Sequence, residues 1–224
     1  MMTLIAEDLL LLLLDDESGK VAGSDTAGLA LGGAVLAELA ILGAVSVDEQ
    51  TSRFRSPKVR VTGPAPEDRV LADALDVVAE KERPAQSLVE RLGKGLVQTL
   101  GDRLADRGIL ERRESRMLGM LPRTRWPAVN SNHEAEVRRT LTSVLVQGTT
   151  PDPRTGALVA VLAAVDRVHK VVDHDGMSRR EVKRRAAEIA EGAWAASGVR
   201  SAIQASHAAV TAAVAAAAAA GAAG

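Results

Sequence analysis

Residues 26–43, TAGLALGGAVLAELAILG, are apolar on nearly every side of a helix, and they set the architecture of the whole chain. A helix that is apolar all round is typically buried at the centre of a larger protein. Its glycines let neighbouring helices approach closely, at a cost of roughly 1 kcal/mol each relative to alanine. We therefore predict that this segment is a central, buried helix.

Glu38 is the one charged residue inside this apolar segment. A buried carboxylate must be paired or hydrogen-bonded, so the predicted partner is an arginine or a helix N-terminus, with a catalytic role as the alternative. The charge and the glycines also argue against a membrane span, which needs about 20 predominantly apolar residues. The leucine-rich segment 3–14 carries Glu7 and Asp8 and lacks the basic start of a signal peptide. Both segments are predicted to be buried helices of a soluble core.

The rest of the chain shows mostly helical periodicity. Helices are predicted at 67–80, at 84–107, from Ser131, at 154–172 behind Asp152-Pro153, and from Ser178. Alternating residues predict short strands at 44–47, 53–55 and 59–61, and 109–122 resembles a hairpin with arms at 109–111 and 117–121. The following PRTRWP loop has no regular period. The prediction is a mainly α fold: a single-domain helical bundle of amphipathic helices around a central buried apolar helix, with short β-hairpins.

The C-terminal residues 205–224 are rich in alanine and low in complexity. Such a segment is only marginally helical on its own and is expected to fray at residues 221–224. We therefore divide the chain into a helical domain at 1–204 and an alanine-rich tail at 205–224.

Composition narrows the classes of function. The chain has 28 basic and 29 acidic residues, for a net charge of -1, so it has no global basic field to attract nucleic acid. Phe54, Trp126 and Trp194 are the only aromatic residues, which excludes a stacking platform for single strands. The absence of cysteine excludes disulfides, thiolate catalysis and cysteine-ligated zinc.

No recognised catalytic motif is present: the chain lacks a P-loop, GxGxxG, GxSxG and HExxH. His169 and His174 are five residues apart, which does not place both on one face of a helix as a spacing of four would. We therefore predict that the chain is not an enzyme and has no metal site and no cofactor. An enzymatic alternative requires Glu38 and a histidine to meet in a cleft.

The predicted hairpin carries the most distinctive local pattern. Arginines at positions 112, 113, 116, 123 and 125 are interleaved with Met117, Leu118, Met120, Leu121 and Trp126. Insertion into an anionic membrane surface would need this combination, since a basic side chain near such a surface contributes about 1 kcal/mol. A buried apolar side chain contributes a further ~1.5–3 kcal/mol. The alternative is that the apolar side chains pack on the helical core and the arginines are solvated.

Five segments in consistent order resemble the Golgi phosphoprotein 3 family, especially its bacterial, actinobacterial-type members. They are LIAEDLLLLLLDDESGK (4–20), ALGGAVLAELAILGAVSV (30–47), LGDRLADRGILERRE (100–114), PRTRWPA (122–128) and DPRTGALVAVLAAV (152–165). The resemblance covers roughly residues 3–200. It implies a mostly helical fold with a β-hairpin. In eukaryotic members of the family it implies peripheral membrane binding through phosphatidylinositol 4-phosphate and adaptor work in retaining glycosyltransferases.

The resemblance also implies site residues. The family's headgroup pocket uses a tryptophan and three basic residues, which align with Gly23, Gly32, Lys94 and Val97, so only Lys94 keeps the required chemistry. Glu90, four residues before Lys94, is placed for a helical ion pair instead. The membrane-facing hairpin and its basic rim correspond to Met117, Leu118, Met120, Leu121, Arg116, Arg123, Arg125 and Trp126.

Together these observations predict a peripheral membrane-binding or adaptor protein, cytoplasmic and bound to the inner face of the membrane. The candidate partners are an anionic, phosphoinositide-like lipid, a protein or a second copy of the chain, and nucleic acid is excluded. The alternative function is a protein-interaction scaffold without lipid binding. Salt separates the two, because arginine-led membrane binding weakens as ionic strength rises and hydrophobic docking does not.

Overall fold

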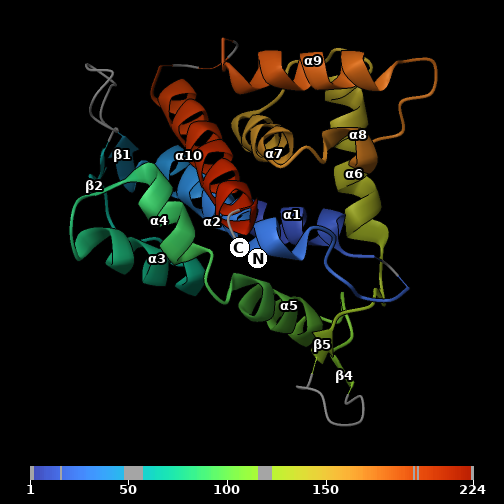
Figure 1. The fold of residues 1–224 in the computed structure, drawn as a ribbon, viewed down its shortest axis with the longest axis horizontal. Helices are drawn as coiled ribbons and strands as arrows, with labels where there is room; N and C mark the ends of the chain where they lie inside the picture. The colour runs from blue at the N-terminus through green and yellow to red at the C-terminus, as the bar shows by residue number, and fades with distance from the viewer. Residues whose placement is uncertain are drawn as a thin grey trace.

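The computed structural model describes residues 3–15, 17–47, 58–115, 123–193, 195 and 197–222. Within this part of the chain the fold is mainly helical, with two small antiparallel sheets (Figure 1). The elements are α1 (Ile5–Leu13), α2 (Ser24–Ile41), β1 (Val45–Val47), β2 (Lys58–Val61), α3 (Arg69–Ala79), β3 (Arg83–Pro84), α4 (Ala85–Leu92), α5 (Leu96–Asp106), β4 (Arg113–Ser115), β5 (Arg123–Arg125), α6 (Asn132–Leu145), α7 (Pro153–Ala164), α8 (Val168–Val171), α9 (Arg179–Ala190) and α10 (Ser197–Ala222).

The central helix is α2, as the sequence predicts. It packs against α1, α4, α7 and α10, so neighbouring helices surround it (Figure 1). Its glycines make the closest approaches: a Cβ on Gly33 would lie 2.2 Å from Val210 Cγ2 of α10. The leucines of α1 are buried as well, so the predictions for 3–14 and 26–43 are confirmed.

The predicted helix at 84–107 is wrong in one respect, because it is two helices. α4 ends at Leu92 and α5 begins at Leu96, with a turn between them in which Gly95 has a φ of +75°. Leucines spaced by four residues continue across the turn, which hides the break from a pattern-based prediction. The N-cap of α4 is Pro84, and Ser87 lies inside the helix.

The helix predicted at 154–172 ends earlier, at Ala164. Asp166 follows with a φ of 54°, a left-handed conformation that interrupts the helix before the short α8. The start of α7 is as predicted, because the Asp152 carboxylate accepts hydrogen bonds from the amides of Arg154 and Thr155. Ser178 caps α9 in the same way.

The hairpin exists, but its strands lie further along the chain than predicted. β4 pairs with β5, with Arg113 opposite Arg125 and Glu114 opposite Thr124. The PRTRWP segment therefore contains a strand, whose arginines and threonine give no apolar alternation. The predicted arm at 117–121 lies outside the described residues, as does the predicted strand at 53–55.

The alanine-rich segment is part of one long helix, α10, which crosses the predicted boundary at 204/205 without a break. Ile203, Val210 and Ala213 are buried against the body, so the first half of the segment contributes to the core. Residues 203–222 are also long and apolar enough, by length and composition alone, to cross a membrane, and 22% of that window is buried. A core helix of a soluble protein passes the same test.

Candidate functional site

Lys94 lies in the turn between α4 and α5, where the chain crosses the surface of α2. The turn is tightly packed: a Cβ on Gly93 would lie 2.2 Å from the carbonyl oxygen of Gly28. Gly95, on the other side of Lys94, has a positive φ that an L side chain rarely adopts. The two glycines therefore hold the backbone of Lys94 against α2, while its side chain is exposed to solvent.

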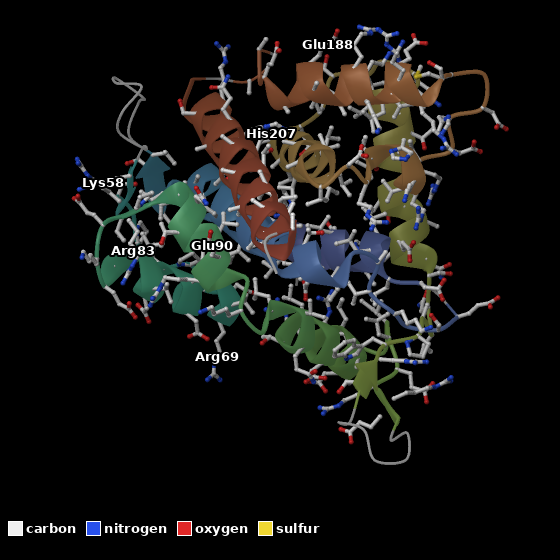
Figure 2. All side chains as sticks on the ribbon, viewed as in Figure 1. Lys58, Arg69, Arg83, Glu90, Glu188 and His207 are labelled. Atoms are coloured by element: carbon white, nitrogen blue, oxygen red, sulfur yellow. The ribbon has the colours of Figure 1, made fainter. Side chains whose placement is uncertain are left out.

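Lys94 forms no ion pair with any residue that the structure describes. The helical pair with Glu90, which Figure 2 labels on α4, is not made, and Glu90 instead accepts a hydrogen bond of 3.3 Å from Gln86. The reason is the end of α4 at Leu92, which places Lys94 beyond the helix and removes the i, i+4 geometry. Its ammonium group is thus available to an anion.

The other aligned headgroup positions also lie on or near α2. Gly32 packs under α4, where a Cβ would lie 2.3 Å from the Val89 carbonyl oxygen, and Val97 is half-buried in α5. Gly32 therefore leaves no room for a large side chain between α2 and α4. Val97 carries no charge. Gly23 is the N-cap residue of α2 and has a φ of 67°.

A second cation lies against α2 that sequence reasoning missed. The guanidinium Nη2 of Arg167 is 2.8 Å from the position that a Cβ on Gly23 would take. Gly28, which the Lys94 turn contacts, lies five residues after Gly23, and this spacing is about 7.5 Å along a helix. Arg167 and the Lys94 turn therefore contact neighbouring turns of α2. No local pattern marks Arg167, because it comes from the link between α7 and α8.

Trp126 anchors the base of the hairpin. Its side chain is only 4% exposed, and a Cβ on Gly101 would lie 2.5 Å from its ring. The indole Nε1 donates a hydrogen bond of 3.3 Å to the Asp102 carboxylate of α5. Leu110 is bridged to Ala128 below the paired strands. Trp126 thus fixes the hairpin to α5 and is not available to contact a membrane.

The hairpin arginines fall into two groups. Arg112 and Arg113 are exposed but paired, with Arg112 Nη2 2.8 Å from Glu114 and Arg113 Nη2 2.6 Å from Glu111. Arg125 is half-buried in β5 and forms no ion pair with the described residues. The backbone of Arg123 is described, whereas Arg116 and the apolar residues Met117, Leu118, Met120 and Leu121 lie outside the described part of the chain.

A buried ionic cluster connects the start of α1 to α5. Glu7 is fully buried, and its Oε1 lies 2.9 Å from Arg103 Nε and 3.0 Å from Arg107 Nη1. Arg103 also binds the Asp68 carboxylate at the N-cap of α3 through both terminal nitrogens. Burial raises the pKa of Asp68, but Arg103 and the amides of Val70 and Leu71 together hold that pKa below its usual value. This cluster positions α1, α3 and α5 relative to one another.

Glu38 has both of the partners predicted for it. Its carboxylate is paired with Arg154 of α7 and accepts a hydrogen bond of 2.8 Å from the amide of Ile5 at the start of α1. Burial raises the pKa of Glu38 despite these partners. Burial also raises the pKa of Asp8, which lies beside the same arginine and binds His133 at 2.7 Å.

This cluster does not have the geometry of a catalytic site. The Thr3 hydroxyl and the Asp8 carboxylate both contact the same nitrogen, Nε2 of His133, at 3.2 and 2.7 Å. In a nucleophile-activating triad the two partners occupy different ring nitrogens. Glu38 contacts no histidine among the described residues, and these residues contain no group of three His, Cys, Asp or Glu side chains suited to hold a metal ion. The arrangement is that of a structural ionic network.

Comparison with known protein families gives one match that covers most of the chain. The family model for Golgi phosphoprotein 3 (GPP34) matches residues 5–206, which include α1 to α9 and the first part of α10. The chain therefore belongs to the Golgi phosphoprotein 3 family, whose proteins are peripheral membrane proteins and are generally not enzymes. A search of curated proteins gave no match.

Proposed function

We propose that this chain is a peripheral membrane-binding or adaptor protein that docks on anionic lipid surfaces. The observation that carries the proposal is Lys94, an exposed cation without an ion pair to the described residues, at the position that the family resemblance gives to a lipid headgroup contact. Arg167, from the link between α7 and α8, adds a second positive charge near the start of α2. Cations of this kind attract the phosphate groups of anionic lipids.

The headgroup specificity is expected to be broad. Gly23, Gly32 and Val97 supply neither an aromatic ring nor a charge at the three other positions of the family's pocket. One lysine and one arginine that contact different turns of α2 recognise negative charge rather than a particular pattern of phosphates. We therefore expect binding to anionic lipids in general, without strong preference for phosphatidylinositol 4-phosphate.

The hairpin is the second part of the proposal. The sequence between β4 and β5 includes the apolar residues Met117, Leu118, Met120 and Leu121 and the cation Arg116, and β5 carries Arg123 and Arg125. The base of the hairpin is fixed to α5 through Trp126. The buried Trp126 is left out of the proposed membrane contact.

Vesicle co-sedimentation tests the proposal. The chain should bind vesicles that contain phosphatidylglycerol and not neutral phosphatidylcholine vesicles, and binding should weaken between low salt and ~0.15 M salt. Lys94→Glu should reduce binding, whereas Lys81→Glu, the same change at an exposed lysine after α3, should not. Absence of binding to every vesicle would overturn the proposal. Strong selectivity for phosphatidylinositol 4-phosphate would contradict the expected loss of specificity.

A protein-interaction scaffold is the second candidate, and α10 favours it. The outward side of this helix, including Thr211, Ala212 and residues 215–222, is exposed and carries no charge. A helix face that carries only small, uncharged residues can pack closely on another helix. If this function is correct, the chain binds no vesicle and self-associates in light scattering, to the same extent at low and ~0.15 M salt.

A further inference from the structure

An open groove of about 680 Å³ lies between the second half of α6 and the short helix α8. Its volume is in the range of small-molecule sites, which is about 300–1,000 Å³. Figure 1 shows α6 and α8 on the opposite side of the molecule from α4, so the groove is separate from Lys94. The hairpin also lies elsewhere, beyond α5. The function proposed above uses none of the residues that line this groove.

Two exposed cations line the groove from opposite walls: Arg139 on α6 and Lys170 on α8. Arg139 Nε donates a hydrogen bond of 3.3 Å to the carbonyl oxygen of Ala135, which leaves its terminal nitrogens without a carboxylate among the described residues. Lys170 likewise forms no ion pair with the described residues. The one carboxylate in the lining, Asp173, accepts a hydrogen bond from the Asp175 amide. The groove therefore has an excess of positive charge.

The walls are held in place by a third arginine. Arg138 binds the Glu134 carboxylate at 2.6 Å and donates a hydrogen bond of 2.9 Å to the Val171 carbonyl oxygen, so it joins α6 to α8. Val171 and Val172 are buried and form part of the lining. An ion pair beside such an apolar surface is less screened than one in open water.

The end of α6 could oppose anion binding, because the carbonyl groups at a helix C-terminus carry partial negative charge. Arg185 of α9 removes much of this effect. Its Nη1 donates hydrogen bonds of 2.9 and 2.7 Å to the carbonyl oxygens of Leu145 and Val146. Thr142, Ser143 and Gln147 add neutral hydroxyl and amide donors to the same wall.

We propose that this groove binds a phosphate-bearing ligand, with Arg139 and Lys170 as the charged contacts and the side chains of Thr142, Ser143 and Gln147 as neutral donors. A phosphate has several oxygens with which to accept hydrogen bonds from both walls at once. The shared chemistry is the phosphate monoester or diester. It belongs either to a soluble phosphorylated compound or to the headgroup of a lipid.

The first experiment titrates the full-length, ¹⁵N-labelled chain with inorganic phosphate and follows its amide resonances by NMR. The amides of Ser143, Gln147 and Lys170 should shift in a saturable way. Combining Arg139→Gln with Lys170→Gln should weaken binding about tenfold or more, since two charge-assisted hydrogen bonds are lost. The matched control combines Arg69→Gln with Lys81→Gln, which removes two exposed cations near α3. The control should bind phosphate as the unaltered chain does.

Absence of saturable shifts in the groove, or an equal loss of binding in the control, would overturn the proposal. Vesicles containing phosphatidylglycerol then identify the source of the phosphate. If the groove variant loses phosphate binding and vesicle binding, the ligand is a lipid headgroup. If it loses phosphate binding alone, the ligand is a soluble compound. Saturable phosphate binding by a chain that binds no vesicle would support the groove and refute the membrane function, so the two failures are distinguishable.

Discussion

Replacing Arg154 with methionine would leave the Glu38 carboxylate buried beneath α1 with its main partner removed. Glu38 is only 3% exposed, and Arg154 also donates a hydrogen bond of 2.5 Å to the carbonyl oxygen of Thr3. Removing one partner of a buried ion pair typically lowers the free energy of unfolding by about 3–5 kcal/mol. Arg154 is itself 28% exposed, so we expect the lower end, a loss of about 3 kcal/mol in the free energy of unfolding.

Urea denaturation, followed by circular dichroism and extrapolated to water, measures this loss. The exposed pair between Arg184 and Glu188 provides the matched control, because both side chains are 56% exposed. Arg184→Met should therefore cost at most about 1 kcal/mol. Adding Glu38→Gln to Arg154→Met should recover much of the loss, since the buried charge is then absent while the Ile5 amide keeps an acceptor.

The pH dependence of this loss has a definite sign. Burial raises the pKa of folded Glu38 above its unfolded value, and Arg154 is the largest influence that opposes the rise. In Arg154→Met the folded pKa rises further, so near neutral pH the carboxyl loses its proton more readily when unfolded than when folded. Stability of the variant then increases as pH falls through that raised pKa. A loss below 1 kcal/mol at neutral pH, or one that does not shrink in acid, would refute this account.

Four further perturbations test other parts of the structure. Gly32→Ala should destabilise the fold by about 1–3 kcal/mol, because its Cβ would lie 2.3 Å from a carbonyl oxygen of α4, and an unchanged thermal midpoint would contradict that packing. Asp152→Ala should cost about 1 kcal/mol of urea stability by uncapping α7, and Asp152→Asn should retain most of it. Replacing Arg123 and Arg125 with glutamate should abolish co-sedimentation with anionic vesicles, and unaltered binding would remove the hairpin rim from the proposal. Deleting residues 216–224 should leave the urea midpoint unchanged, since the described residues among them are exposed, and a clear fall would show that they are packed.

The parts of the fold that depend on local chemistry could be predicted from the sequence. The burial of α2 follows from the apolar residues on nearly all of its sides. The pairing of Glu38 follows from the free-energy cost of burying a charged carboxylate without a partner. The start of α7 follows from Asp152, whose side chain satisfies the first amides of the helix.

The parts that depend on tertiary contact could not be predicted. The break at Gly93–Gly95 exists because the α4–α5 turn meets Gly28, and nothing within four residues of the break reports that contact. Arg167 reaches Gly23 from the other half of the chain. Trp126 looked like part of an amphipathic hairpin, but its partner Gly101 is a small residue on α5 that leaves space for the ring. The family resemblance supplied Lys94, and only the structure shows that its charge has no ion-pair partner among the described residues.

The position of α10 has a consequence for how the protein is made. This helix covers α2, α4 and α7, yet it follows all three of them in the chain. Until residues 203–213 have left the ribosome, one side of α2 has no partner, because Val210 closes over Gly33. Contacts between such distant segments form slowly, and exposed apolar surface in the meantime favours aggregation. The nascent chain should therefore hold an unfinished core until α10 has been made, and during that time it should be a client of chaperones that bind apolar helices.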